Sequence, residues 1–202
     1  MEVLLIDNSP LILYGLSSCL EETGRFSVAG QIKTLTEAQR FIEKARFLPS
    51  LIILEILLNE EYRLDFLYFL KQYCLKNKIL KPPVLICSSL SDPFRIRSVL
   101  EEGAAGFLPK TADKSELLRA VNTIISGDVY VNEEYSIKLK ESSLLHAQFT
   151  KREMEILSLV KQNKPNRQIA EELFISIRTV ENHISNIYTK TDLRTRQELL
   201  KL

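Results

Sequence analysis

Five short apolar runs recur along the first 126 residues, and an amphipathic stretch separates each run from the next. The runs are apolar at consecutive positions, which is typical of strands buried on both faces of a parallel sheet. The predicted strands are residues 3–6, 26–29, 51–54, 84–87 and 106–108.

The stretches between these runs have the apolar spacing of amphipathic helices. The predicted helices are residues 10–22, 36–45, 64–75, 93–102 and 115–125. Five strand-helix units in succession predict an α/β fold with a doubly wound, five-stranded parallel sheet. Ligands of such sheets bind outside the carboxyl ends of the strands.

Four of the predicted strands are followed, at or just beyond their ends, by a residue with a reactive or charged side chain. These residues are Asp7, Glu55, Ser88 and Lys110. Because the carboxyl ends of parallel strands meet at one edge of the sheet, we expect the four side chains to converge. Together they outline a pocket suited to a phosphoryl group.

This spacing, with the sequence GAAGFLPK at 103–110, resembles the receiver domain of two-component response regulators over about residues 1–126. The resemblance implies a flavodoxin-like fold. It also implies Mg²⁺ binding by two acidic residues after the first strand, phosphorylation of an Asp after the third, and sensing by a Ser or Thr and a mobile aromatic residue. The matching residues are Asp7, Asn8, Glu55, Ser88, Phe107 and Lys110.

Two of the family's carboxylates differ here. Asn8 keeps an oxygen ligand but lacks the negative charge from which Mg²⁺ gains much of its affinity. Glu55 keeps the charge but moves its carboxylate by roughly one bond length, whereas productive geometry tolerates only about an ångström of misplacement. We therefore predict a degenerate phosphorylation pocket with no catalytic residue. No cofactor is expected, since Mg²⁺ binding should be weakened, and no sensor kinase is needed.

Two hypotheses for this pocket remain open. In the first, Glu55 forms a salt bridge with Lys110 and stands in permanently for a phosphorylated aspartate, which holds Ser88 and Phe107 in an active-like arrangement. In the second, Glu55 and Lys110 merely satisfy each other in a decayed pocket, and the domain is a dimerising scaffold.

The periodicity fades over residues 127–147, which we interpret as a linker that begins at the helix-stopping Gly127 and contains a short helix near residues 133–140. We assign no function to His146 within it. Residues 149–202 carry 10 basic and 7 acidic residues in a chain of net charge +1. This C-terminal excess favours a nucleic-acid partner.

A capping box marks the next helix, because Thr150 can cap its N-terminus and Glu153 can reciprocate, while Phe149 can pack on Met154. Asn166 is the predicted cap of a second helix, and Ser176 that of a third. In the third helix Val180, Ile184 and Ile187 form the inner apolar stripe. Two short helices with a tight turn between them predict a small all-α helix-turn-helix domain.

Several motifs of residues 148–202 resemble the LuxR-type helix-turn-helix. They are FTxRE from 149, NxxIAxxL from 166, ISxxTVxxH from 175 and NIxxK from 186. A receiver joined to such a domain resembles the NarL/FixJ class of response regulators. The resemblance implies a DNA-binding surface at Arg178, Thr179, Val180, Glu181, Asn182, His183, Ser185, Asn186 and Lys190. Amides and hydroxyls can read base edges, and cations can neutralise phosphates. We expect His183 to pack or to touch phosphate rather than to bind metal.

The leading prediction is a sequence-specific transcription regulator, not an enzyme, that binds double-stranded DNA as a homodimer without phosphorylation. The alternatives are a conventional phospho-switched regulator and an interaction protein that binds DNA weakly. RNA polymerase is a further candidate partner. Three unpaired cysteines indicate a reducing compartment, and no segment suggests a membrane. The expected location is the bacterial cytoplasm, with the plastid stroma as the alternative.

Overall fold

The computed structural model describes residues 1–58, 61–62, 64–146, 149–191 and 193–200. The chain divides into two compact units, Met1–Leu139 and Lys140–Leu202. The predicted start of the DNA-binding domain, residue 148, lies outside the described residues.

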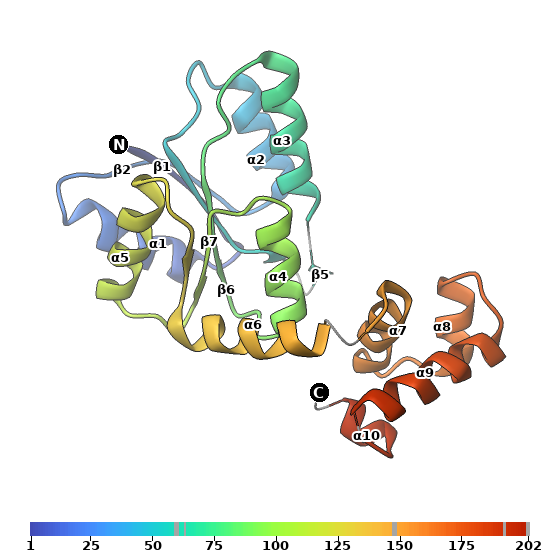
Figure 1. The fold of residues 1–202 in the computed structure, drawn as a ribbon. Coiled ribbons are helices and arrows are strands. Elements are labelled where there is room, and N and C mark those ends of the chain that lie inside the picture. Colours follow the sequence, from blue (N-terminus) through green and yellow to red (C-terminus); the bar gives the residue numbers. More distant parts are fainter. Residues whose placement is uncertain (59–60, 63, 147–148, 192, 201–202) are drawn as a thin grey trace. The chain divides into compact units, whose positions relative to one another are not determined.

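A parallel sheet forms the centre of the first unit (Figure 1). Its strands, in spatial order, are β2 (Ser27–Ile32), β1 (Glu2–Ile6), β3 (Leu51–Leu54), β6 (Val84–Ser88), β7 (Gly106–Pro109) and β8 (Tyr130–Val131). The middle strands β1, β3 and β6 are buried almost throughout, which is why they are apolar at consecutive positions. The α/β doubly wound fold is confirmed.

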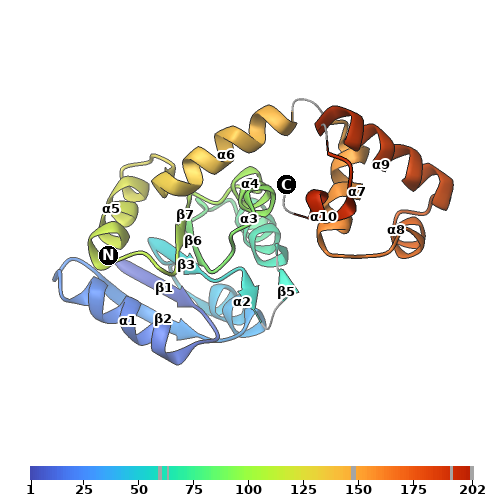
Figure 2. The ribbon, with the colours of Figure 1, turned by 90° about the horizontal axis from the view of Figure 1, so that it is seen from below.

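Helices cover both faces of this sheet (Figure 2). One face carries α1 (Pro10–Glu21) and α5 (Lys114–Ile125) over a core that includes Leu13, Leu20 and Leu117. The other carries α2 (Leu35–Lys44), α3 (Asp65–Asn77) and α4 (Pro93–Glu101) over a larger core that includes Phe66 and Val99. Burying each of these large apolar side chains contributes about 1.5–3 kcal/mol. The cysteines are free, and Cys74 and Cys87 are buried.

The prediction of five strands was wrong, because β8 adds a sixth beside β7. This strand has only two residues, too few for a recognisable apolar run. A Cβ at Gly106 would lie 2.5 Å from the backbone oxygen of Tyr130, so glycine permits the close approach of β7 and β8. A short antiparallel pair, β4 (Leu57–Leu58) and β5 (Glu61–Tyr62), was also not predicted.

Helix α6 (Glu133–His146) follows β8 and is longer than the predicted helix near residues 133–140. The first compact unit includes β8 and the beginning of α6, and it therefore extends beyond the predicted receiver boundary at residue 126. His146 is the last residue of α6.

The second unit contains α7 (Lys151–Lys161), α8 (Asn166–Glu172), α9 (Ile177–Thr191) and α10 (Arg196–Leu199). Its small core includes Leu157, Ile169 and Ile187. Thr150 and Glu153 form the predicted capping box at the start of α7. Among the described residues, no helix is long and apolar enough to cross a membrane.

Candidate functional site

The sheet brings the predicted pocket residues to one edge. Asp7 and Glu55 directly follow β1 and β3, Ser88 ends β6, and Lys110 directly follows β7. The parallel hydrogen-bond ladder continues into these positions: Glu55 N donates to Ile6 O at 2.8 Å, and Lys110 N donates to Ser88 O at 3.0 Å. The pocket is thus positioned by the backbone of the sheet itself.

Glu55 lies at the centre of the pocket with only 2 % of its surface exposed. Its Oε2 atom is 2.8 Å from Lys110 Nζ, so the predicted Glu55–Lys110 ion pair is present. Its Oε1 atom accepts hydrogen bonds from the backbone N–H of Leu57, at 2.8 Å, and from the Ser88 hydroxyl. Both carboxylate oxygens are therefore engaged.

Lys110 joins the two carboxylates of the pocket, because its Nζ also lies 2.7 Å from Asp7 Oδ2. Burial acts to lower the pKa of the Lys110 ammonium, but the hydrogen bonds to Asp7 and Glu55 outweigh burial and raise the pKa above its usual value. Burial also raises the pKa of the nearby Cys87 thiol to about 12. Cys87 is therefore a neutral thiol at physiological pH.

The other two predicted pocket residues lie in different surroundings. Phe107 is fully buried in the apolar core, and its ring meets that of Tyr135 edge to face with 5.0 Å between centroids. Asn8 is exposed, directly after Asp7. Sequence reasoning missed Tyr135, which comes from the predicted linker and belongs to no family motif that we identified.

The residues present do not fit Mg²⁺. Asp7 Oδ1 accepts the backbone N–H of Ser9 at 2.7 Å, while Asp7 Oδ2 and Glu55 Oε2 both bind the Lys110 ammonium. A dication would have to compete with this ammonium for its carboxylate ligands. Within the described ranges, no three His, Cys, Asp or Glu side chains converge as a metal site.

The second unit presents α9 as the exposed element of a helix-turn-helix. Helix α9 packs on α7 and α8 through Val180, Ile184 and Ile187, which are buried. Ser176 Oγ accepts the backbone N–H of Thr179 at 3.0 Å, so Ser176 caps α9 as predicted.

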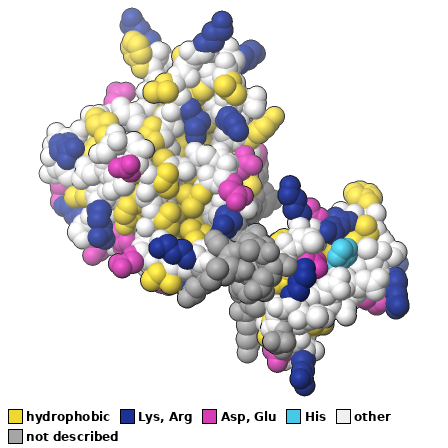
Figure 3. Space-filling model, in the orientation of Figure 1, with side chains coloured by type: hydrophobic (Ala, Val, Ile, Leu, Met, Phe, Trp, Pro, Cys, Tyr) yellow, Lys and Arg dark blue, Asp and Glu magenta, His cyan; other side chains and the backbone are white. Residues whose placement is uncertain are grey.

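The opposite face of α9 is polar. Arg178, Glu181, Asn182, Ser185 and Asn186 are exposed there, whereas Thr179 and His183 are half-buried. Figure 3 shows one face of this unit, and Lys and Arg side chains are exposed on that face. This set of amides, hydroxyls and cations has the chemistry needed to contact both base edges and phosphates.

Two residues of the predicted DNA-binding set have other positions. Val180 is fully buried in the core of the second unit, so its side chain cannot reach DNA. The Lys190 ammonium lies 2.6 Å from the Glu153 carboxylate and 5.8 Å from the centre of the Phe149 ring. Lys190 therefore connects α9 to the start of α7. The two residues of this ion pair, Lys190 and Glu153, are 37 positions apart in the sequence.

The predicted cap of α8 was also wrong. Asn166 is the first residue of α8 rather than its cap, and its Oδ1 accepts a hydrogen bond from Arg196 at 2.9 Å. Arg196 also donates to Lys164 O, while Arg152 donates to Leu173 O at the other end of α8. Two arginines thus hold α8 in place, and neither contact has a local sequence signal.

Residues 3–122 match the family model of the response regulator receiver domain, and residues 147–202 match that of the bacterial regulatory proteins of the luxR family. The chain belongs to the response regulator family. It combines a receiver with a DNA-binding LuxR-type domain, as NarL/FixJ-class response regulators do, and is a transcription regulator rather than an enzyme.

Two relatives of this response regulator are bacterial proteins. It is 30 % identical to the transcriptional regulatory protein LiaR of Bacillus subtilis, with 98 % of this chain and 94 % of LiaR covered. It is 28 % identical to the response regulator VraR of Staphylococcus aureus, with 98 % and 93 % covered. Nothing among these relatives supports the plastid alternative.

Solved structures share the fold of this response regulator. RcsB from Salmonella enterica serovar Typhimurium, bound to a promoter in the presence of the phosphomimetic BeF₃⁻, has a TM-score of 0.70 at 20 % identity and covers 100 % of this chain and 96 % of its own. A structure of two RcsB dimers bound to two parallel DNAs has a TM-score of 0.71 at 20 % identity, with the same coverage.

Proposed function

We propose that this response regulator binds specific DNA sites as a homodimer and that Glu55 keeps its receiver in an active-like arrangement without a phosphoryl group. The receiver of residues 1–126 regulates. Residues 127–147 connect it to the second unit, and their first part, up to Leu139, belongs to the same compact unit as the receiver. Residues 148–202 bind DNA in the bacterial cytoplasm. RNA polymerase is the partner at the promoter, and no sensor kinase is required.

The observation that carries this proposal is the set of contacts around Glu55. A phosphorylated aspartate would offer anionic oxygens to a cation, a hydroxyl and a backbone N–H, which form strong charge-assisted hydrogen bonds. Glu55 already makes one contact of each kind, with Lys110, Ser88 and the Leu57 N–H. Its extra methylene extends the carboxylate towards these groups.

The same contacts argue against phosphorylation. A carboxylate that attacks phosphorus needs an oxygen free to approach in line, and both oxygens of buried Glu55 are engaged. A misplacement of about an ångström is enough to slow such a reaction by about two orders of magnitude. Both oxygens of Asp7 are held, by the Lys110 ammonium and by the Ser9 N–H, so a metal that neutralised the incoming phosphate would have to displace these contacts.

The exposed face of α9 supports the DNA-binding part. Asn182 and Asn186 can pair with adenine edges in the major groove, and Arg178 can neutralise a phosphate. A dimer would place two such helices on a two-fold symmetric site about one helical turn apart. RcsB, which shares the fold, is found as dimers on DNA.

The test is DNA selection with untreated, full-length protein, followed by affinity measurements on the selected site. We expect a two-fold symmetric site, and we expect Glu55→Gln to weaken both DNA binding and dimerisation. Glu43→Gln is the matched control, because it removes an exposed carboxylate from α2 of the same unit. The proposal fails if wild-type protein selects no site until a small phosphodonor modifies it, or if the two variants behave alike.

A further inference from the structure

The beginning of α6 is attached to the receiver beside the buried Phe107. Tyr135 is buried, with 9 % of the residue exposed, and its ring packs on the Phe107 ring with 5.0 Å between the ring centroids. Arg97 of α4 donates to Leu139 O at 2.6 Å, and the backbone N–H of Asn132 donates to Phe107 O at 3.2 Å. Figures 1 and 2 both show α6 beside α4. The first turns of α6 therefore pack as part of the receiver.

The segment before α6 has a separate attachment to α5. The Tyr130 hydroxyl donates to Glu116 Oε1 at 3.0 Å, and the Asn132 amide donates to the same oxygen. These bonds hold the chain where α6 begins but do not involve the ring of Tyr135. The Tyr135 contact is therefore a second attachment of α6 to the receiver, separate from these hydrogen bonds.

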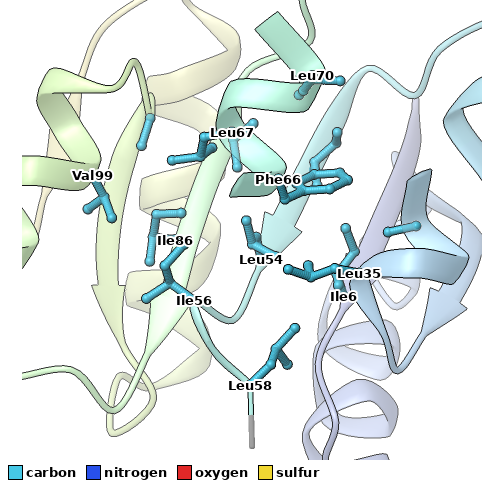
Figure 4. Packing of buried hydrophobic residues seen from close by; sticks show 14 of the residues in the cluster. Ile6, Leu35, Leu54, Ile56, Leu58, Phe66, Leu67, Leu70, Ile86 and Val99 are labelled. Carbon is cyan, nitrogen blue, oxygen red and sulfur yellow. The ribbon is translucent and has the colours of Figure 1, made fainter. Parts of the chain in front are cut away.

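A continuous series of packed residues joins the Glu55 pocket to Tyr135. The Ser88 hydroxyl donates to Glu55 and accepts the Leu90 N–H at 3.1 Å. Leu90 is buried in the same apolar cluster as Phe107 and Tyr135. The cluster also contains Ile56, which directly follows Glu55 and lies against Ile86 (Figure 4). Close-packed clusters of this kind shift between discrete arrangements rather than deforming gradually.

We propose that Tyr135 is the positioning residue through which the Glu55 pocket fixes helix α6, the helix that continues from the receiver to residue 146. While Glu55 holds Ser88 and the loop at Leu90, Phe107 stays buried and presents the surface on which Tyr135 packs. Loss of the Glu55 contacts loosens this cluster and releases the first turns of α6. The inference rests on the proposed function, because it describes how the Glu55 contacts in the pocket affect helix α6.

Hydrogen exchange of the full-length protein measures the attachment directly. We expect Tyr135→Ala to raise the exchange of backbone amides at residues 133–139 by roughly two- to tenfold, which is the range that an aromatic pair contributes. Tyr135→Phe keeps the ring and should match wild type. Ile137→Ala is the matched control, because it shortens an exposed apolar side chain on the same helix. Tyr135→Leu replaces the Ala variant if that protein does not fold.

A double-mutant cycle on DNA affinity then links Tyr135 to Glu55. We expect each single variant, Tyr135→Ala and Glu55→Gln, to bind DNA with lower affinity than wild type. We expect the affinity of the double variant to be no lower than that of the more affected single variant. Simple additivity would mean that the two residues act separately and would overturn the inference. If Glu55→Gln weakens binding and Tyr135→Ala changes neither exchange nor affinity, the inference fails while the proposed function stands. If neither variant changes affinity, both fail.

Discussion

The Lys190 ammonium near the end of α9 lies 2.6 Å from the carboxylate of Glu153 in the first turn of α7. Only 3 % of the Glu153 side chain and 33 % of the Lys190 side chain are exposed. Lys190, which the family resemblance assigned to a DNA phosphate, therefore also connects α9 to the start of α7.

Lys190→Met should destabilise the second unit. The variant keeps most of the length of the side chain but leaves the buried Glu153 carboxylate without its cation, which costs about 1–3 kcal/mol. We expect faster amide exchange in α7 and α9 and weaker binding to all DNA sequences.

The salt dependence of DNA binding distinguishes a residue that stabilises the second unit from a residue that contacts a DNA phosphate. The slope of log affinity against log salt should be unchanged in Lys190→Met. Arg178→Met, at the exposed start of α9, should reduce that slope by about one. A reduced slope for Lys190→Met would show that Lys190 contacts phosphate after all.

The Glu153 ion pair also predicts a loss of stability in acid. Burial acts to raise the pKa of this carboxyl, but the hydrogen bonds from Lys190 and Thr150 dominate and lower the pKa below its usual 4.5. A lowered pKa in the folded state means that the stabilisation is complete above about pH 4.5 and is lost as the pH falls through the folded-state pKa. Thermal unfolding of the second unit between pH 6 and pH 3 should show this loss. Glu153→Gln should make this loss of stability in acid smaller. Glu155→Gln, which removes an exposed carboxylate, should leave the loss unchanged.

Gly106→Ala should weaken the pairing of β7 with β8. The added methyl group would lie 2.5 Å from Tyr130 O, so the sixth strand has to move, at a cost of about 1–3 kcal/mol. Exchange of the Tyr130 amide should rise accordingly.

Gly15→Ala should have the opposite effect, because nothing lies within 4 Å of the new methyl group in α1. We expect this substitution to stabilise the folded protein by about 0.4–1 kcal/mol. Equal effects of the two variants would contradict this account.

Restoring both family carboxylates should restore phosphorylation. The double variant Asn8→Asp/Glu55→Asp shortens the central side chain, frees space beside Lys110 and supplies a third anionic ligand for Mg²⁺. We expect a small phosphodonor with Mg²⁺ to add one phosphoryl group to this variant and none to wild type, as measured by intact mass. Asn8→Asp/Glu55→Asn is the control, since it lacks an acceptor carboxylate. Phosphorylation of the wild-type protein would refute the role proposed for Glu55.

Much of the fold could be predicted because its signals are local. A strand buried on both faces, such as β3 at Leu51–Leu54, needs apolar residues at every position, and the observed strand has the predicted bounds. The capping box at Thr150 is equally local, since its donors and acceptors lie within one helical turn. The convergence of Glu55 and Lys110 was predictable as well, because residues that follow parallel strands meet at one edge of the sheet.

The remaining features depend on contacts between residues far apart in the chain. The β8 strand is too short to be recognised alone and exists because Gly106 lets its backbone approach β7. The partner of Lys190 could not be inferred from its place in α9, because the choice between DNA and Glu153 depends on how α7 packs beside it. In the same way, residue types and their spacing establish the carboxylate pocket and the helix-turn-helix, but only three-dimensional packing places Tyr135 of the expected linker against Phe107. Periodicity and capping are visible within a few residues, whereas these contacts arise only when distant elements pack together.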